Sequence, residues 1–238
     1  MAMPFDETRP PKWLKPLGIF TVIFFLAAQA LAVINSPADR DMGHLQKIMY
    51  VHVPSAWLAF VGFGVVLVFS LLYIWKRDLK YDLVAASAAE VGTLFTALTI
   101  AQGSIWGRPT WGVWWTWDPR LTTTAILLLI FIGYVALRSF TDDEDRRARW
   151  SAAVGILGAI NVPIVYYSVK WWRTIHQVQS SPETMSRVYV VGLLLNLAAF
   201  SVLLVWFIVY RYYGSKLERR VEQRFEAAAL NNGVAAEV

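Results

Sequence analysis

The chain has 238 residues, of which 57% are hydrophobic, and it carries a formal net charge of +5. Its apolar residues form six blocks long enough to cross a hydrocarbon core of about 30 Å, which excludes a soluble globular domain. The basic residues lie at the ends of these blocks, so we interpret the charge as topology anchoring in a lipid bilayer and expect no nucleic-acid partner. The sequence has no cysteine, which excludes disulfides and thiolate-ligated metals.

The six apolar blocks predict one all-α fold, a polytopic membrane bundle of six transmembrane helices. Because a bilayer core has no water to satisfy backbone groups, each block must be helical. The first block could instead be a cleaved signal peptide, but its apolar run continues past the small-residue pattern at 28–30, which favours a retained helix. In chain order the blocks cover residues 17–34, 57–75, 83–101, 121–137, 152–169 and 188–210.

The distribution of Lys and Arg predicts the orientation of the bundle. With the N-terminus inside, 15 of the 22 basic residues fall on inner segments and 7 on outer loops. Both termini are therefore expected on the cytoplasmic side of a bacterial-type inner membrane. The expected organisation is a cytoplasmic N-terminus (1–16), a membrane domain (17–210) and a cytoplasmic amphipathic tail (211–238).

The inner segments contain two further helix signals. The turn before the fifth helix has a capping-box pattern from Thr141 to Glu144, which predicts an inner extension of that helix. In the tail, Leu217, Val221 and Phe225 recur every four residues, which predicts an amphipathic helix. Such a helix lies either on the membrane surface or against a partner, and the sequence leaves both open.

Two residues that are unusual in a transmembrane helix, an acidic residue and a proline, fall inside the predicted spans. Glu90 is the only acidic residue within a span, and an intramembrane carboxylate is costly. It marks a proton or ligand path, a neutral hydrogen-bonded residue or a partner contact, and the sequence does not choose among them. Pro163 is expected to kink the fifth helix because proline lacks a backbone donor.

The outer segment between the third and fourth helices, residues 102–120, is unusually rich in tryptophan. Five of the twelve Trp lie within residues 106–117, and Gly107, Pro109, Gly112 and Pro119 interrupt regular structure there. A plain interfacial belt needs fewer tryptophans, so we expect a flat apolar platform for a planar aromatic ligand. The platform candidates are Trp106, Trp111, Trp114, Trp115, Trp117 and Asp118, although the aspartate is too anionic to stack on an aromatic ring.

Two histidines are predicted on the same outer side as this loop. His52 lies in YVHVPSAW, just before the second helix, and His176 lies in WWRTIHQ, just after the fifth. Two neutral imidazoles can fill both axial positions of a haem iron. Without cysteine the group would be held non-covalently, as haem b. His44 lies in a polar stretch and is interpreted as solvated.

The run WGRPTWGVWWTWDPRLT over residues 106–122 closely resembles the tryptophan-rich WWD domain of haem-handling proteins. The six-helix length and the contexts of His52 and His176 resemble, within that superfamily, the CcmC family of haem exporter proteins of cytochrome c maturation. The resemblance covers about residues 17–210, and the tail carries nothing recognisable.

This resemblance implies haem bound at the periplasmic face with His52 and His176 as axial ligands. It implies delivery to a periplasmic haem chaperone, CcmE, together with a small subunit, CcmD, and the ATP-binding cassette subunits CcmA and CcmB. The chain has no phosphate-binding loop and no visible catalytic motif. Arg108 and Arg120 are expected to pair with haem propionates, and Asp118 to orient Arg120 or a backbone turn.

Three other functions compete with haem delivery. An electron-transfer cytochrome subunit generally holds its histidines deep within spans, where this sequence predicts none. A haem or solute permease is weakly supported, since Glu90 and Pro163 are the only charged or helix-breaking positions inside the predicted spans. A plain interaction scaffold predicts a colourless protein.

Overall fold

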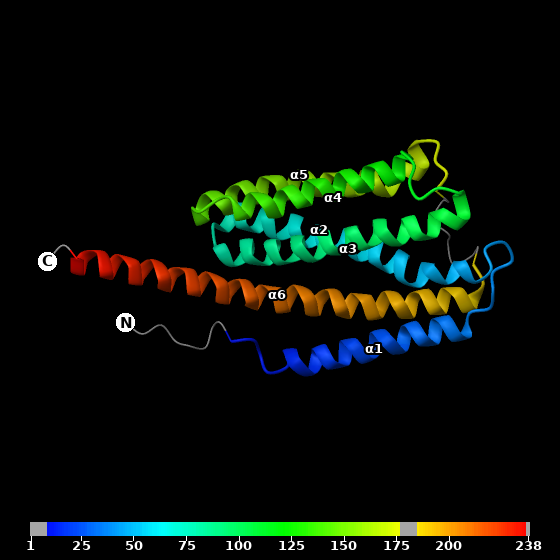
Figure 1. Ribbon diagram of the computed structural model, residues 1–238, viewed down its shortest axis with the longest axis horizontal. Helices are drawn as coiled ribbons and strands as arrows, with labels where there is room; N and C mark the ends of the chain where they lie inside the picture. Colours follow the sequence, from blue (N-terminus) through cyan, green and yellow to red (C-terminus); the bar gives the residue numbers. More distant parts are fainter. Residues whose placement is uncertain (1–8, 177–184, 237–238) are drawn as a thin grey trace.

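The computed structural model describes residues 9–176 and 185–236, which form six long α-helices joined by short connections (Figure 1). All six are long and apolar enough to cross a membrane, so the predicted fold class is confirmed. All six helices extend beyond the predicted blocks at both ends. Their bounds are α1 Leu14–Asn35, α2 Met49–Lys76, α3 Leu79–Trp111, α4 Pro119–Ser139, α5 Glu144–Trp171 and α6 Arg187–Ala236, with a short 3-10 helix, η1, at His44–Ile48 before α2.

The helices alternate in direction and pack in layers (Figure 1). The pair α4 and α5 lies against the pair α2 and α3, α6 packs on the other side of that central pair, and α1 packs mainly on α6. Alternation brings six helix ends together at one end of the bundle, which we call the tryptophan end. It is formed at Asn35, Met49, Trp111, Pro119, Trp171 and Arg187.

Aspartate side chains begin three of the helices. Asp78, Asp118 and Asp143 are the N-caps of α3, α4 and α5, and each accepts a hydrogen bond from a backbone N–H in the first turn. The predicted inner extension of the fifth helix is present, but its cap is Asp143. The Thr141 hydroxyl donates back to the Leu137 carbonyl instead of capping α5.

The core depends on close approach of neighbouring helices. The rings of Phe63 in α2 and Phe131 in α4 stack with centroids 3.7 Å apart. A Cβ at Gly158 of α5 would lie only 2.8 Å from the Phe131 ring, so the small residue lets α5 reach α4. Small residues at helix interfaces serve this purpose in membrane proteins, where van der Waals contact replaces hydrophobic driving force.

Prolines are accommodated inside the helices. Pro54 of α2 has no N–H to donate to the Tyr50 carbonyl, and that carbonyl accepts from the Gln29 side chain of α1, with 3.3 Å between Nε2 and the oxygen. Helix α5 continues without interruption through Pro163. The kink expected there stays a prediction.

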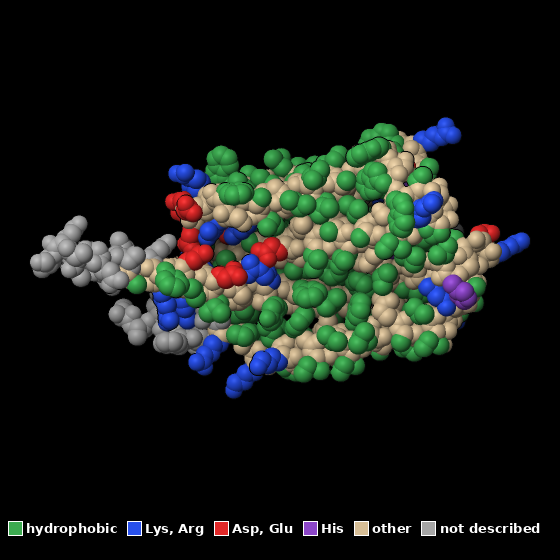
Figure 2. Space-filling view, viewed as in Figure 1, with side chains coloured by type: hydrophobic (Ala, Val, Ile, Leu, Met, Phe, Trp, Pro, Cys, Tyr) green, Lys and Arg blue, Asp and Glu red, His purple; other side chains and the backbone are tan. Residues whose placement is uncertain are grey.

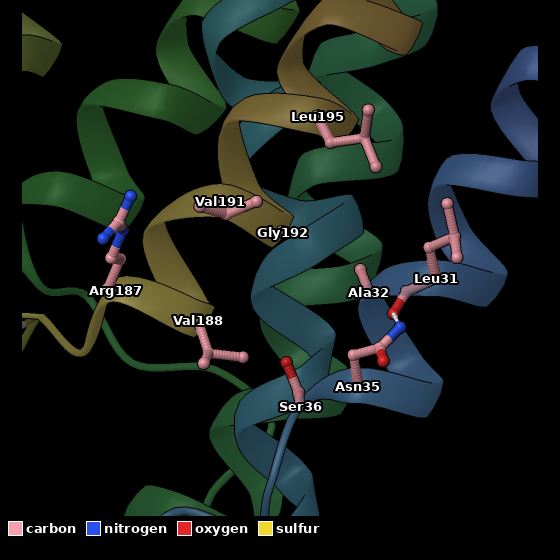
Figure 3. Close-up of a pocket in the computed structure, with 9 residues that line it drawn as sticks. All are labelled: Leu31, Ala32, Asn35, Ser36, Arg187, Val188, Val191, Gly192 and Leu195. Atoms are coloured by element: carbon pink, nitrogen blue, oxygen red, sulfur yellow. Dashed lines mark hydrogen bonds between the residues drawn. The ribbon is translucent and has the colours of Figure 1, made fainter.

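Helix α1 is attached to the bundle through α6. The Trp206 indole of α6 donates to the Leu14 carbonyl at 3.1 Å. At the tryptophan end a cavity of about 440 Å³ separates the two helices, lined by apolar side chains such as Leu31, Val188 and Leu195 (Figure 3). Contact between α1 and α6 is therefore looser at that end.

The predicted tail is not a separate helix. Residues 215–230 continue α6, which is assigned as one helix from Arg187 to Ala236. Leu217, Val221 and Phe225 are exposed on this extension, as an amphipathic pattern requires. Its contact with a membrane or a partner stays a prediction, and residues 1–8 and 237–238 of the expected termini lie outside the described residues.

Ion pairs join the helices at the end opposite the tryptophan end. Arg138 of α4 makes two bonds of 2.7 and 2.9 Å to Asp82 of α3. The Glu90 carboxylate of α3 accepts two hydrogen bonds, from Nε and Nη2 on one edge of the Arg211 guanidinium of α6. Of the three interpretations of Glu90, the structure therefore supports a hydrogen-bonded residue within the bundle, but as part of an ion pair and not as a neutral group. In Figure 2 the charged side chains gather at the two ends, and hydrophobic side chains cover the stretch between them.

Candidate functional site

The tryptophan-rich segment is more helical than the sequence predicts. Helix α3 continues through Gly107 and Pro109 to Trp111, so only residues 112–118 of the expected 102–120 loop lie outside helices. The helix ends at Gly112, whose φ of +80° is the left-handed conformation that favours glycine. Proline removes only one donor near a helix end, so it is this glycine that ends α3.

His52 lies inside α2 and not before it. Its ring meets the Trp106 ring edge-on, with centroids 5.7 Å apart and planes at 81°. Gly103 of α3 makes room for the imidazole, because a Cβ there would lie 3.1 Å from Cε1 of His52. Among the described residues, the buried Nδ1 of His52 has no hydrogen-bond partner.

His176 lies after the end of α5, on the segment that leads away from Trp171. Its ring is 6.1 Å from the Trp111 ring, centroid to centroid. Trp106 and Trp111 are five residues apart near the end of α3, so His52 and His176 lie against the same end of that helix. The structure therefore brings the two predicted ligands to one place from α2 and from the end of α5. His44 lies exposed at the start of η1, as expected for a solvated residue.

The tryptophans divide into buried and exposed members. Trp106 and Trp115 are partly buried, whereas Trp114 is 60% exposed and Trp117 is 78% exposed. The Trp115 and Trp117 rings meet edge-on at 5.7 Å, so the five side chains form an irregular surface and not one flat sheet.

Two more tryptophans enlarge this aromatic surface. Trp171 and Trp172 are 58% and 50% exposed and meet edge-on at 5.8 Å, at the end of α5 just before His176. The sequence carries a signal for them, a Trp pair four and five residues before His176, but they lie outside the predicted platform.

Asp118 is buried and joins two segments of the site. Its carboxylate accepts from the Arg120 backbone N–H at 2.9 Å as the N-cap of α4. It also accepts from the Thr174 hydroxyl, at 2.8 and 2.7 Å to its two oxygens, and from the Ile175 backbone N–H at 2.8 Å. Asp118 therefore bonds to the backbone at the start of α4 and to the segment after α5, and its role toward a ligand stays a prediction.

The two arginines use backbone carbonyls as acceptors. The Arg108 guanidinium donates to the Gly112 carbonyl at the end of α3. The Arg120 guanidinium donates to the Val165 and Tyr166 carbonyls of α5, both at 3.2 Å. A guanidinium has five N–H donors, so both side chains keep donors for propionates, and that role stays a prediction.

The chemistry of this end suits a planar ligand with a metal centre. In residues 9–176 and 185–236 no group of three or more His, Asp or Glu side chains could hold a bare metal ion. Two imidazoles can still complete an iron whose four other ligands come from a porphyrin. In the described part of the chain, buried atoms without a hydrogen-bond partner occur at both ends. They are more numerous here, where they include Gln102 Oε1, Trp106 Nε1 and Thr122 Oγ1, than at the opposite end, where Ser70, Tyr134 and Ser151 have them. The residues present therefore fit haem.

Comparison with known proteins identifies relatives over most of the chain. A family model described as CcmC, Heme exporter protein C, matches residues 7–227. Heme exporter protein C of Bradyrhizobium diazoefficiens is 38% identical over 214 residues, covering 88% of this chain and 80% of the relative. Heme exporter protein C of Escherichia coli K12 is 34% identical over 167 residues, covering 69% and 68%. The protein of that name from Haemophilus influenzae is 32% identical over 216 residues, covering 89% and 88%.

Proposed function

The chain belongs to the Heme exporter protein C family, and we propose that it binds haem at the tryptophan end and delivers it to a periplasmic haem chaperone. Membership of the family implies haem export in cytochrome c maturation. The observation that carries the proposal is that His52 of α2 and His176 beyond α5 both lie against tryptophan rings near the end of α3, at Trp106 and Trp111.

His52 and His176 are the proposed axial ligands of a non-covalently bound haem b. Haem supplies an iron with two open axial positions, and neutral imidazoles are suitable ligands for it. The His52 imidazole contacts the edge of the Trp106 ring on one side. On the other side it packs against Gly103, which has no side chain and so leaves room for it. His176 is on a non-helical segment beside Trp111, so the two ligands have different supports.

The tryptophans are proposed to bury the macrocycle and leave one edge open. Aromatic side chains favour offset stacking on a flat ring system. Trp114 and Trp117 are exposed, which leaves a surface that a haem chaperone can reach. The remaining donors of Arg108 and Arg120 are proposed to pair with propionates.

The tryptophan end is proposed to face the periplasm of a bacterial inner membrane, with both termini in the cytoplasm. The excess of Lys and Arg on the other set of segments supports this orientation. The proposed partners are the chaperone CcmE, the small subunit CcmD and the ATP-binding cassette subunits CcmA and CcmB. ATP hydrolysis is assigned to partners because the sequence has no phosphate-binding loop.

Absorption spectra of the purified full-length protein test the ligand assignment. The wild type is expected to show a bis-histidine Soret band that weakens or shifts in His52→Ala and in His176→Ala. His44→Ala is the matched control, because His44 is exposed at the same end, and it should keep the wild-type spectrum. The assignment fails if both variants keep that spectrum while His44→Ala loses it.

Transfer of haem tests the delivery step separately. The haem-loaded protein, mixed with the purified chaperone, should lose its Soret absorbance as haem appears on the chaperone. Haem that stays on the chain in the presence of the chaperone contradicts delivery and leaves the ligand assignment intact.

One observation favours the electron-transfer alternative. His52 lies inside α2 and not in a loop, so one candidate ligand belongs to a membrane-spanning helix, although it is in the first turn and not deep within the span. A reversible redox titration coupled to quinone would support that alternative. Family membership favours haem export.

A further inference from the structure

We propose that Asp118 is a positioning residue that holds His176 in place for haem and does not itself touch haem. The proposal rests on the proposed function, since it takes His176 as an axial ligand. It changes the role of the aspartate in the tryptophan-rich motif from a platform residue to a clamp between α4 and the segment after α5.

Both oxygens of the Asp118 carboxylate accept hydrogen bonds from described residues. Three groups donate to its two oxygens at 2.7–2.9 Å: the Arg120 N–H, the Thr174 hydroxyl and the Ile175 N–H. The residue is only 6% exposed. A buried carboxylate with these donors has little capacity left for a ligand, and its charge repels anionic propionates.

The bonds pass from Asp118 to His176 in a short chain. The Thr174 hydroxyl donates to Asp118, and its oxygen accepts from the His176 backbone N–H at 3.0 Å. The Ile175 N–H between them is bonded directly to the carboxylate. Asp118 thus fixes the backbone on which the imidazole is carried, at the one candidate ligand that no helix supports.

Charge strengthens this clamp. The carboxylate lies at the N-terminus of α4, where the helix dipole stabilises an anion. Hydrogen bonds to a charged acceptor are roughly twice as strong as neutral ones. His52 needs no such clamp because it is built into α2, so loss of Asp118 should affect the two ligands unequally.

Substitutions can separate the clamp from the helix cap. Asp118→Ser keeps an N-cap for α4, but serine is too short to bridge to Thr174. Thr174→Val removes the hydroxyl with little change in shape, and Thr174→Ser restores it. Asp143→Ser is the matched control, because Asp143 caps α5 in the same way at the opposite end of the bundle.

Hydrogen exchange of the Ile175 amide, measured on the full chain without haem, reads the clamp directly. We expect exchange to rise roughly tenfold or more in Asp118→Ser, as for loss of a bond to a charged acceptor, and to be unchanged in Asp143→Ser. Unchanged Ile175 exchange in Asp118→Ser would overturn the proposal, whatever the behaviour of haem.

The absorption spectrum of the haem-loaded protein then tests whether His176 coordinates the iron. Asp118→Ser and Thr174→Val should reproduce the spectrum of His176→Ala, added imidazole should restore the six-coordinate band in each, and Thr174→Ser should resemble the wild type. Should His176→Ala alone change the spectrum, the ligand assignment stands and the clamp is wrong. Should His176→Ala leave the spectrum unchanged, the ligand assignment is wrong, and Ile175 exchange still decides on the clamp.

Discussion

The two ends of the bundle treat their polar groups differently. At the opposite end, arginines pair with carboxylates across helices: Arg138 with Asp82, Arg211 with Glu90 and Arg219 with Glu144. At the tryptophan end the arginines donate to backbone carbonyls, and Trp114 and Trp117 are exposed. Among the described residues, more buried atoms lack a hydrogen-bond partner there than at the opposite end.

This difference separates stability from binding. A buried ion pair whose partners satisfy each other holds its helices together and has little to offer a ligand. Groups without partners cost free energy in the empty protein and recover it when a ligand or another chain satisfies them. The opposite end is therefore where substitutions should unfold the protein, and the tryptophan end is where they should change haem binding.

The largest effect is expected from breaking the most buried ion pair. Arg138→Leu leaves Asp82 charged and unpaired, with the two side chains only 16% and 7% exposed in the wild type. The free energy of unfolding should fall by about 3–5 kcal/mol, measured by denaturation in detergent. Haem affinity of the protein that stays folded should not change.

A double variant tests the reason for that loss. Arg138→Leu combined with Asp82→Leu removes both charges, so most of the lost stability should return. A double variant as unstable as Arg138→Leu would mean that packing around Arg138, and not the unpaired charge, causes the effect.

The next effect is expected at the tryptophan end. Gly103→Val places a branched side chain where even a Cβ lies 3.1 Å from His52, so the imidazole must move. Overpacking of this kind costs about 1–3 kcal/mol, which corresponds to roughly ten- to hundredfold weaker haem binding if it falls on the bound geometry. Haem titration measures it, with Gly64→Val as control because nothing lies within 4 Å of a Cβ there.

A smaller effect is expected from an exposed tryptophan. Trp114→Ala should weaken haem binding by about 0.5–1.5 kcal/mol, the range for one aromatic contact, and leave the unfolding transition unchanged. Trp150→Ala is the matched control, since Trp150 is equally exposed, at 60%, but lies on α5 toward the opposite end. Equal haem affinity in the two variants would mean that the exposed tryptophans form only an interfacial belt.

The smallest effect is expected from an exposed ion pair at the opposite end. Lys80→Ala removes the partner of Asp78, but both side chains are largely in solvent. Exposed pairs contribute little to stability, so the unfolding midpoint should not move. A clear loss of stability would show that burial is not what distinguishes this pair from Arg138 and Asp82.

Hydropathy and charge predicted the six helices because lipid imposes one solution on an apolar segment. The boundaries were less predictable. Pro54 and Pro109 look like helix breakers in sequence, yet α2 and α3 run through them, and the Gln29 side chain occupies the carbonyl that Pro54 leaves free. Such compensation depends on another helix, which a local pattern does not contain.

The candidate site was predictable in composition but not in connection. His52, His176 and the tryptophans carry distinctive local contexts, and the structure places them at one end. The bond from Thr174 to Asp118 spans 56 positions, and the pair of Arg211 with Glu90 spans 121. The spacing of residues within one helix contains no information on contacts between residues so far apart in the sequence. The roles of Asp118 and Glu90 therefore do not follow from the sequence pattern.

The length of α6 places one helix in two solvents. Its 50 residues span about 75 Å, whereas the hydrocarbon core is about 30 Å thick. It begins level with the other helices at Arg187 and passes beyond them at the opposite end, so the surplus lies on that side (Figure 1). Inside lipid, opening one of its backbone bonds exposes unsolvated polar groups, while in the aqueous part water replaces the lost partner. Resistance to unwinding must therefore fall along α6, from the hydrocarbon segment toward its C-terminal turns.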